Sequence, residues 1–542
     1  MSRHPFVLGR LGLVAVAVSL SAFGGAAGAA TRYVSPDGRN EYPYTSPEDA
    51  AWKIQSAVDA AVEGDHVLVG PGVYREHVIL KEGVNLSGPA REHVTIYGVT
   101  PGKPVLTLTW DNTVKGLTIV GPPCAGVGIY AELGVPPAKT GSFKPFRISD
   151  CWILRCAGPG ILVFARQEPS EVLLRPDPQF ASPEEWERYF EAIYDTELEV
   201  ELSGCHIGSR DGSGIVVHIQ DLSGKYEGHS FSEPWGGLFG GPIELGFKHA
   251  TLRMSECTIA HCRDDGIIVR AGWRDRAQVI LDRCAIYYNE RYGIYVASGG
   301  GHLSDAVVRM NGCLLFGNQK AAVWSFSIDD GSWGMIGVEP SAHGHVFAES
   351  STIARNSVGI VGCPFPPGSA GGAGQGINLK NCIVFGNADS DIDFTWFREH
   401  ALLMARGISH SCVGWKELAG LRGNIDGDPL FADPEHGDYR LLPGSPCIDA
   451  GGMYLRPTLI VQDRAPLISW DPGKDLDANP RISGNGPDMG AYEGLGEPPN
   501  YLLEGSEDLA TWSEEYYGPA TTWTDPDAGP FSTKFYRVRV GR

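Results

Sequence analysis

Hydrophobic and polar positions repeat along the middle of the chain in a pattern that predicts short, stacked β-strands. Each repeat reads Cys-x-Ile, then a polar turn residue, then Gly-Ile-x-Val, and a third alternating segment precedes the cysteine. A strand this short cannot bury an apolar face alone, but stacked copies bury a continuous core. Neighbouring repeats are as close as 27 and 29 residues, which suits one coil of a three-sided parallel β-helix. The repeats begin at Cys151, Cys205, Cys257, Cys284, Cys313, Ser351 and Cys382.

Two positions of the repeat predict columns of like side chains inside the coils. Twelve cysteines would ordinarily suggest disulfides if the chain is exported. Most of them recur at one place in the repeat, however, and cysteine packs as a small buried hydrophobe. We therefore expect stacked thiols rather than a disulfide framework or a metal site. The turn between the two strands predicts an internal amide ladder, formed by Asn289, Asn318, Asn356 and Asn387.

The N-terminus has the order of regions that is typical of a secretory signal. A basic start with two arginines is followed by an apolar run over residues 11–23 and by small residues up to Ala30. We predict that residues 1–29 are a signal peptide, with cleavage after Ala29 or Ala30. The apolar run is shorter than the roughly 20 residues of a membrane span, so no stable membrane insertion is expected. The predicted location is extracellular or at the cell surface, with the periplasm as the alternative.

A capping helix is expected in front of the first coil. Ser46 and Pro47 are typical helix-start residues, and apolar residues follow on one face at Ile54, Val58, Ala61 and Val62. Residues 64–76, Gly-Asp-His-Val-Leu-Val-Gly-Pro-Gly-Val-Tyr-Arg-Glu, then begin the coils, behind Tyr-Val-Ser-Pro-Asp-Gly at 33–38. These two motifs resemble the opening of pectate-lyase-like right-handed β-helix proteins.

The C-terminal part carries a second resemblance. Asp-Pro-Leu-Phe at 428–431, the motif Asp-Tyr-Arg-Leu-Leu-Pro-Gly-Ser-Pro-Cys-Ile-Asp-Ala-Gly that begins at Asp438, and Asp-Met-Gly-Ala-Tyr-Glu at 488–493 are similar to the choice-of-anchor Q module of bacterial proteins. Both resemblances together imply an all-β chain. Its expected parts are a right-handed parallel β-helix with its N-terminal cap over residues 30–423, an anchor-like end over 424–497, and a small β module over 498–542.

Composition and charge limit the partners. The formal charge is −21, and removal of a signal peptide with two arginines and no acid would make it −23. A surface this acidic argues against nucleic acid and anionic membranes as general partners. It does not exclude an acidic polysaccharide as a partner, because a local basic cleft or bound calcium can overcome the repulsion from the net negative charge. The expected partner is thus a polysaccharide, anionic ones included, and the expected state is a monomer.

Long excursions interrupt the repeat at 164–197, 218–249, 325–345 and 362–376. All four follow the Gly-Ile-x-Val strand, so they should emerge along one edge, and insertions on one face of a repeat array commonly build the binding face. Loops that merely tolerate growth are the alternative. Indoles offer flat faces to pyranose rings, and arginines pair with uronate carboxylates. The candidate substrate-binding residues are His218, Trp235, Trp273, Arg274, Asp329, Asp330 and Trp333.

The order and spacing of Glu244, Lys248 and Arg270 are similar to those of the acidic residue, lysine base and arginine of the chondroitinase B and alginate lyase family. The resemblance implies β-elimination of a uronate, with Lys248, Arg270 and Glu244 as catalytic residues and Glu244 also as a ligand of Ca²⁺. That family uses more than one acidic calcium ligand, whereas only Glu244 is found near this motif.

Two other functions remain open beside the polysaccharide lyase, which is the leading hypothesis. One is a non-catalytic surface protein that binds carbohydrate or acts as an adhesin. The other is a glycoside hydrolase that uses paired carboxylates, for which Asp264 with Asp265 and Asp329 with Asp330 are candidates. Asp264 and Asp265 precede a glycine where the repeat needs a turn, so turn formation is the competing explanation for that pair.

The excursion at 164–197 also carries a helix signal. Residues 182–193 predict a short helix, which we expect to form one end wall of a cleft between the excursions at 218–249 and 325–345.

Overall fold

A computed structural model provides the fold of the 542-residue chain. The residues it describes are 29–121, 126–133, 141–143, 145–166, 172–173, 196–220, 243–244, 249–273, 276–299, 305–327, 343–362, 376–393, 406–452, 458–462, 465–469, 473–494, 501–506, 513–518, 522–524 and 535–540.

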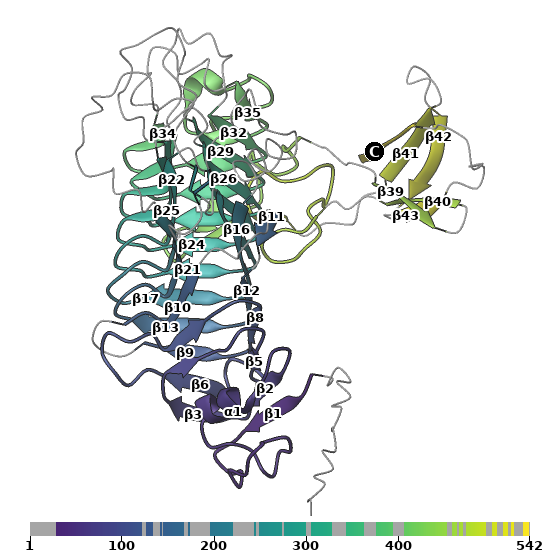
Figure 1. The fold of residues 1–542 in the computed structure, drawn as a ribbon. Coiled ribbons are helices and arrows are strands. Elements are labelled where there is room, and N and C mark those ends of the chain that lie inside the picture. Colours follow the sequence, from purple (N-terminus) through teal and green to yellow (C-terminus); the bar gives the residue numbers. More distant parts are fainter. Residues whose placement is uncertain are drawn as a thin grey trace, which may run out of the picture.

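Three long parallel sheets, here named A, B and C, run the length of a solenoid (Figure 1). Sheet A holds β1 (Thr31–Val34), β2 (His66–Val69), β5 (Asn85–Ser87), β8 (Asn112–Lys115), β11 (Gly141–Phe143), β12 (Phe146–Ser149), β16 (Thr196–Ser203), β20 (His249–Ser255), β23 (Arg276–Asp282), β26 (Asp305–Asn311), β29 (His343–Glu349), β32 (Ile377–Lys380) and β35 (Gly407–Ser409).

Sheet B holds β3 (Gly72–Arg75), β6 (Val94–Tyr97), β9 (Thr118–Val120), β13 (Trp152–Cys156), β17 (His206–Ser209), β21 (Thr258–Ala260), β24 (Ala285–Tyr287), β27 (Leu314–Phe316), β30 (Thr352–Ala354), β33 (Ile383–Phe385) and β36 (Cys412–Val413). Sheet C holds β4 (Val78–Ile79), β7 (Leu106–Leu108), β10 (Ile129–Leu133), β14 (Ile161–Arg166), β18 (Ile215–Gln220), β22 (Ile267–Trp273), β25 (Tyr292–Gly299), β28 (Ala321–Ser327), β31 (Val358–Gly362) and β34 (Ser390–Asp393).

Each coil passes through sheets A, B and C in that order, as β20, β21 and β22 do, and its strands pair in parallel with those of the next coil. Alternate side chains point inward, and their apolar members are almost completely buried. The repeat glycine is required by close stacking, because a Cβ on Gly266 would lie 2.6 Å from the carbonyl oxygen of Gly293. The chain is a right-handed parallel β-helix, and the fold predicted from the repeat is confirmed.

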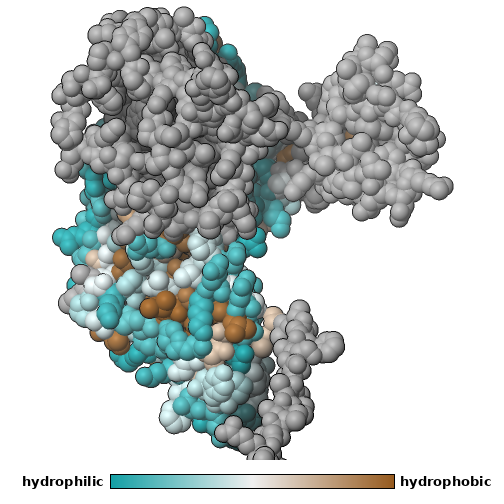
Figure 2. All heavy atoms as spheres, viewed as in Figure 1, coloured by the Kyte–Doolittle hydropathy of each residue, from teal (hydrophilic) through white to brown (hydrophobic). Residues whose placement is uncertain are grey.

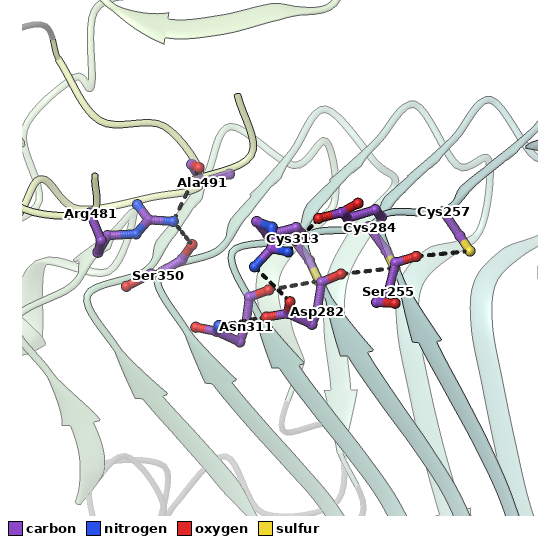
Figure 3. Close-up of polar contacts among 11 residues, drawn as sticks. Ser255, Cys257, Asp282, Cys284, Asn311, Cys313, Ser350, Arg481 and Ala491 are labelled. Carbon is purple, nitrogen blue, oxygen red and sulfur yellow. Dashed lines mark hydrogen bonds and ion pairs between the residues drawn. The ribbon is translucent and has the colours of Figure 1, made fainter. Parts of the chain in front are cut away.

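The cysteines form the predicted column at the turn from sheet A to sheet B. The six that begin repeats are buried and free, and each thiol donates to the carbonyl two residues earlier at 3.1 to 3.4 Å. Figure 3 shows three of them, Cys257, Cys284 and Cys313, in successive coils. The residue before each is in the left-handed region, with φ between 47° and 60°, which makes this turn tight. Burial raises the pKa of Cys382 to about 12, so its thiol stays protonated.

The amide ladder at the turn from sheet B to sheet C is also confirmed. The Nδ2 of Asn289 donates to Oδ1 of Asn318 at 2.8 Å, and the same bond joins Asn318 to Asn356 and Asn356 to Asn387, each at 2.9 Å. The backbone N–H of each asparagine donates to the same acceptor oxygen. The ladder therefore satisfies both amide and backbone donors inside the solenoid.

The N-terminal helix α1 (Ile54–Ala60) starts later than predicted. Ser46 does not cap it, and the side chain instead bonds Asp49 within a turn. The carboxylate of Glu76 accepts the amides of Ile54 and Gln55 at 2.9 and 3.0 Å, and so supplies the cap from a distant part of the chain. Val62, predicted on the apolar face, is 62% exposed. The helix start predicted at Ser46 and Pro47 is therefore wrong.

Beyond the last coil, the chain folds back over the outer face of sheet B. We name residues 425–452 and 473–494 the strap; it includes the hairpin of β37 (Phe431–Asp433) and β38 (Asp438–Leu441). Tyr439 and Ala491 pack on Leu314, Phe316 and Ala354 of the coils. Figure 3 shows the strap's Arg481, which donates to the carbonyl oxygens of Ser350 and Ala491 at 3.4 and 3.2 Å.

The remaining elements are the 3₁₀ turn η2 (Lys416–Leu418), the two-stranded ribbon of β15 (Val172–Leu173) with β19 (Ile243–Glu244), the sheet of β39 (Thr458–Gln462), β40 (Ala465–Ser469) and β43 (Thr522–Thr524), and the sheet of β41 (Tyr501–Ser506), β42 (Ser513–Gly518) and β44 (Phe535–Val540). The pairing of β40 with β43 joins two parts of the chain on either side of residue 497. No helix among the described residues has the length and hydrophobicity to span a membrane.

Candidate functional site on the outer face of sheet C

The four excursions share one edge of the solenoid. Each leaves the end of a sheet C strand and returns at the start of a sheet A strand: β14 to β16, β18 to β20, β28 to β29, and β31 to β32. The predicted common edge is therefore confirmed. Outward side chains of sheet C lie beside this edge. Over the N-terminal coils, Figure 2 shows a mixed surface of hydrophilic and hydrophobic residues.

A row of outward residues crosses three neighbouring coils at this edge. Phe164, His218 and Arg270 are register partners on β14, β18 and β22. They point outward because strand alternation buries the residue before each of them, such as Val217 and Val269. The rings of Phe164 and His218 are stacked, with centroids 5.5 Å apart and planes at 5°. Burial, and then the positive charge of Arg270, lower the pKa of His218 below its ordinary value.

Arg270 is exposed, and its guanidinium lies over the ring of Tyr295 on the next coil, 5.3 Å from the ring centroid. Within the described part of the chain, no carboxylate lies at ion-pair distance from it. The ring thus holds the guanidinium in place without neutralising its charge. In this arrangement the positive group can bind an acidic ligand, and the neutral imidazole beside it can accept a proton from that ligand.

An aromatic cluster continues this face toward the turn from sheet B. The ring of Tyr292 lies 5.6 Å from that of Tyr295 and 5.0 Å from that of Trp324. Arg291 and Lys320 place cationic groups 5.6 and 5.4 Å from the ring of Tyr292. Tyr295 and Trp324 are half-buried and so keep part of their surface open to a ligand. Flat rings between cations suit an acidic sugar.

Asp264 and Asp265 support this cluster. Asp264 is 2.7 Å from the guanidinium of Arg291, and Oδ1 of Asp265 accepts the backbone N–H of Tyr292 at 3.0 Å. The side chain of Asp265 is only 3% exposed, and burial raises its pKa. A carboxyl this deep cannot contact a polymer on the surface. In the structure the two residues form and brace a turn, as the competing explanation for this pair expected.

The residues Trp235, Lys248, Arg274, Asp329, Asp330 and Trp333, and the helix predicted at 182–193, lie outside the described residues. Glu244 is described in its backbone alone, where it pairs with Val172 between β19 and β15. Trp273 is likewise described in its backbone, at the end of β22. The described residues contain no group of three or more His, Cys, Asp or Glu side chains that could hold a metal ion.

The sequence interpretation missed Tyr292, Tyr295, Arg291 and Lys320. A signal for Tyr295 was present, because the x of Gly-Ile-x-Val is the outward position of each sheet C strand. Trp324 occupies the equivalent position on β28. An aromatic residue at an outward position of the repeat is exposed by the strand period alone, so the repeat alignment could have identified both rings.

Comparison with protein-family models agrees with the fold. Residues 190–333 match the family described as "Right handed beta helix region". No curated protein sequence matches the chain. Among solved structures, the chain is similar to pectate lyase Pel9A (13% identity, 87% of this chain and 98% of that chain, TM-score 0.47). It is also similar to the A-module of mannuronan C-5 epimerase AlgE4 from Azotobacter vinelandii (15%, 62% and 90%, TM-score 0.30) and to a rhamnogalacturonan lyase (12%, 74% and 88%, TM-score 0.31).

Proposed function

We propose that this protein is exported, binds an anionic polysaccharide on the outer face of sheet C, and cleaves it by β-elimination at a uronate. The observation that carries the proposal is the register pair of His218 and Arg270. One side chain is held neutral near pH 7 by its lowered pKa, and the other carries a fixed positive charge. Tyr295 and Trp324 provide ring surfaces beside this pair.

The reaction needs three things from the protein. The uronate carboxylate must be neutralised, the C5 proton removed, and the developing negative charge stabilised. Arg270 pairs with the carboxylate, and the imidazole of His218 accepts the C5 proton. The electron pair of the C5–H bond forms the C4–C5 double bond as the C4–O bond breaks, and the departing oxygen takes a proton from solvent or from the imidazolium. Lys248 as base and Glu244 as calcium ligand remain predictions from the family resemblance, and no step above requires them.

The test is a panel of uronate polymers, with product detected by the ultraviolet absorbance of the new double bond. His218→Ala should lower kcat by roughly 10²–10⁴-fold and spare binding, because a proton-transfer group acts in the transition state. Arg270→Ala should also weaken binding, by roughly 10- to 100-fold, because it loses a charge-assisted pair.

Matched controls are available on sheet B. His206 lies in the same coil as His218 and also has a pKa lowered by burial. Arg75 lies over Tyr97 at 5.1 Å, as Arg270 lies over Tyr295, but at the N-terminal end of the solenoid. His206→Ala and Arg75→Ala should leave turnover and binding unchanged. Full activity of the His218 variant would exclude His218 as the base.

A non-catalytic carbohydrate-binding protein is the second candidate. It is favoured by the way both key side chains rest on rings, His218 on Phe164 and Arg270 on Tyr295, which builds a static platform. Binding by the wild-type protein without any unsaturated product would establish this function. Reducing ends without the ultraviolet product would instead indicate a glycoside hydrolase.

A further inference from the structure

The first strand of the solenoid begins at a buried carboxylate. Ala30 immediately precedes β1, and its backbone N–H donates to Oδ1 of Asp65 at 2.8 Å. Its carbonyl oxygen accepts the N–H of His66 at 2.9 Å, which starts the pairing of β1 with β2. Both backbone groups of Ala30 are thus part of the fold. Ala29, one residue earlier, is exposed.

Asp65 is built to hold a positive charge at this point. It is 2% exposed, and its second oxygen, Oδ2, accepts Nε and a terminal nitrogen of Arg32 at 3.2 and 3.0 Å and the amide of Val62 at 3.1 Å. Burial alone would raise the pKa of Asp65, but the amides of Ala30 and Val62 together with Arg32 lower it overall. The carboxylate is therefore ionised, and Oδ1 is directed at the nitrogen of Ala30.

The residues in front of Ala30 fit the small-residue pattern of a signal-peptidase site, with alanines at 27 and 29 around Gly28. We propose that cleavage after Ala29 frees an ammonium group on Ala30 that ion-pairs with the buried carboxylate of Asp65, so that processing completes the N-terminal end of the solenoid.

The chemistry of cleavage explains why the bond between the Ala30 nitrogen and Asp65 becomes stronger. Water adds across the peptide bond, Ala29 leaves with a new carboxylate, and the nitrogen of Ala30 becomes an ammonium group. A neutral amide donor is thereby replaced by a charged one at the same oxygen, and such bonds are roughly twice as strong. Cleavage one residue later would remove both backbone bonds of Ala30. The structure thus distinguishes between the two sites that the sequence left open.

The first experiment is the N-terminal mass of the full-length precursor after expression in an exporting bacterial host. The expected mature chain begins at Ala30. A chain that begins at Thr31 or later, or a folded protein that retains residues 1–29, would overturn the proposal.

The second experiment tests the ion pair itself with two otherwise identical chains, one beginning at Ala30 and the other at Ala29. Their formal charge is the same, and only the position of the ammonium group differs. Amide hydrogens of β1 should exchange roughly tenfold faster in the longer chain, because there the Ala30 nitrogen gives Asp65 a neutral hydrogen bond in place of a charged one. Asp65→Asn should abolish the difference. Asp49→Asn, at a carboxylate that bonds nearby Ser46 and ion-pairs with Arg39 at 3.8 Å, should preserve it. Equal exchange in the two chains with Asp65 intact would refute the ion pair.

Discussion

The interior turns of the solenoid repeat the same side-chain chemistry from coil to coil, whereas the outer face of sheet C changes its side chains from coil to coil. At the turn from sheet A to sheet B, the same chemistry recurs from Cys151 to Ser411, and a serine replaces cysteine without changing the bonds made. Ser351 and Ser411 each donate to the carbonyl two residues earlier at 2.9 Å, as the cysteines do. On the outer face of sheet C, neighbouring residues in register differ in every coil.

The difference has a physical cause. A buried turn has a fixed volume and a fixed set of backbone partners, so each coil must present the same small donor. An outward position on a strand faces solvent or ligand and is free to vary. Repetition in this chain therefore encodes the fold, and the positions that break the repetition on one face are the best candidates for function.

The largest effect is expected when the thiol column receives a charge. Cys284→Asp places a carboxylate where Cys284 is 0% exposed, so we expect a loss of more than about 4 kcal/mol of unfolding free energy or no folded protein at all. Cys284→Ser should cost only about 1 kcal/mol, because serine makes the same bond at Ser351 and leaves only a small void. Urea unfolding midpoints measure both. Similar midpoints for the two variants would show that the column tolerates charge.

Breaking the amide ladder should lower the unfolding free energy by a smaller amount than a charge in the thiol column. Asn318→Ala removes the acceptor of Asn289 and the donor to Asn356, so buried polar groups lose their partners and about 3 kcal/mol of unfolding free energy is expected to be lost. Asn311 is the matched control, because its Nδ2 also bonds a neighbouring coil, at Asp282 and 2.8 Å, but on the exposed face of sheet A. Asn311→Ala should change the midpoint by less than about 0.5 kcal/mol. A control that cost as much as Asn318→Ala would remove the distinction between interior and surface.

The solenoid could be predicted from the sequence because every coil has the same interior volume and the same hydrogen-bond partners at its turns. These shared requirements select the same residue types in each repeat. The cysteine column and the asparagine ladder were both predicted at the correct residues. The helix start failed because the cap is Glu76, more than twenty residues beyond α1's first turn, and local start signals at Ser46 could not reveal it. At the site, His218 was predicted as a substrate-binding residue from its position at an excursion, and Arg270 was predicted as a catalytic residue from the family resemblance. Their pairing with Phe164 and Tyr295 depends on the register between coils, which only the three-dimensional fold provides.

The smallest effect concerns the coupling of two residues on the outer face. Arg270→Ala should raise the pKa of His218, because it removes a positive charge that disfavours the imidazolium. The rise should be partial, since burial is the larger cause of the lowered pKa. NMR titration of a histidine-labelled protein measures this change. His206 is an internal reference in the same spectrum, because its lowered pKa comes from burial, His261 and Arg91 rather than from Arg270.

The sign of the stability effect follows from the same shift. Since the folded-state pKa of His218 lies below the unfolded value of about 6.5, stability is lost as the pH falls through 6.5 toward the folded value. Arg270→Ala should reduce that loss, while Arg75→Ala should leave it unchanged. A His218 pKa that did not respond to Arg270→Ala would mean that solvent screens the two side chains from each other. In that case their register pairing would not create a joint site, and Arg270 alone, as a binding residue, would account for the charge on this face.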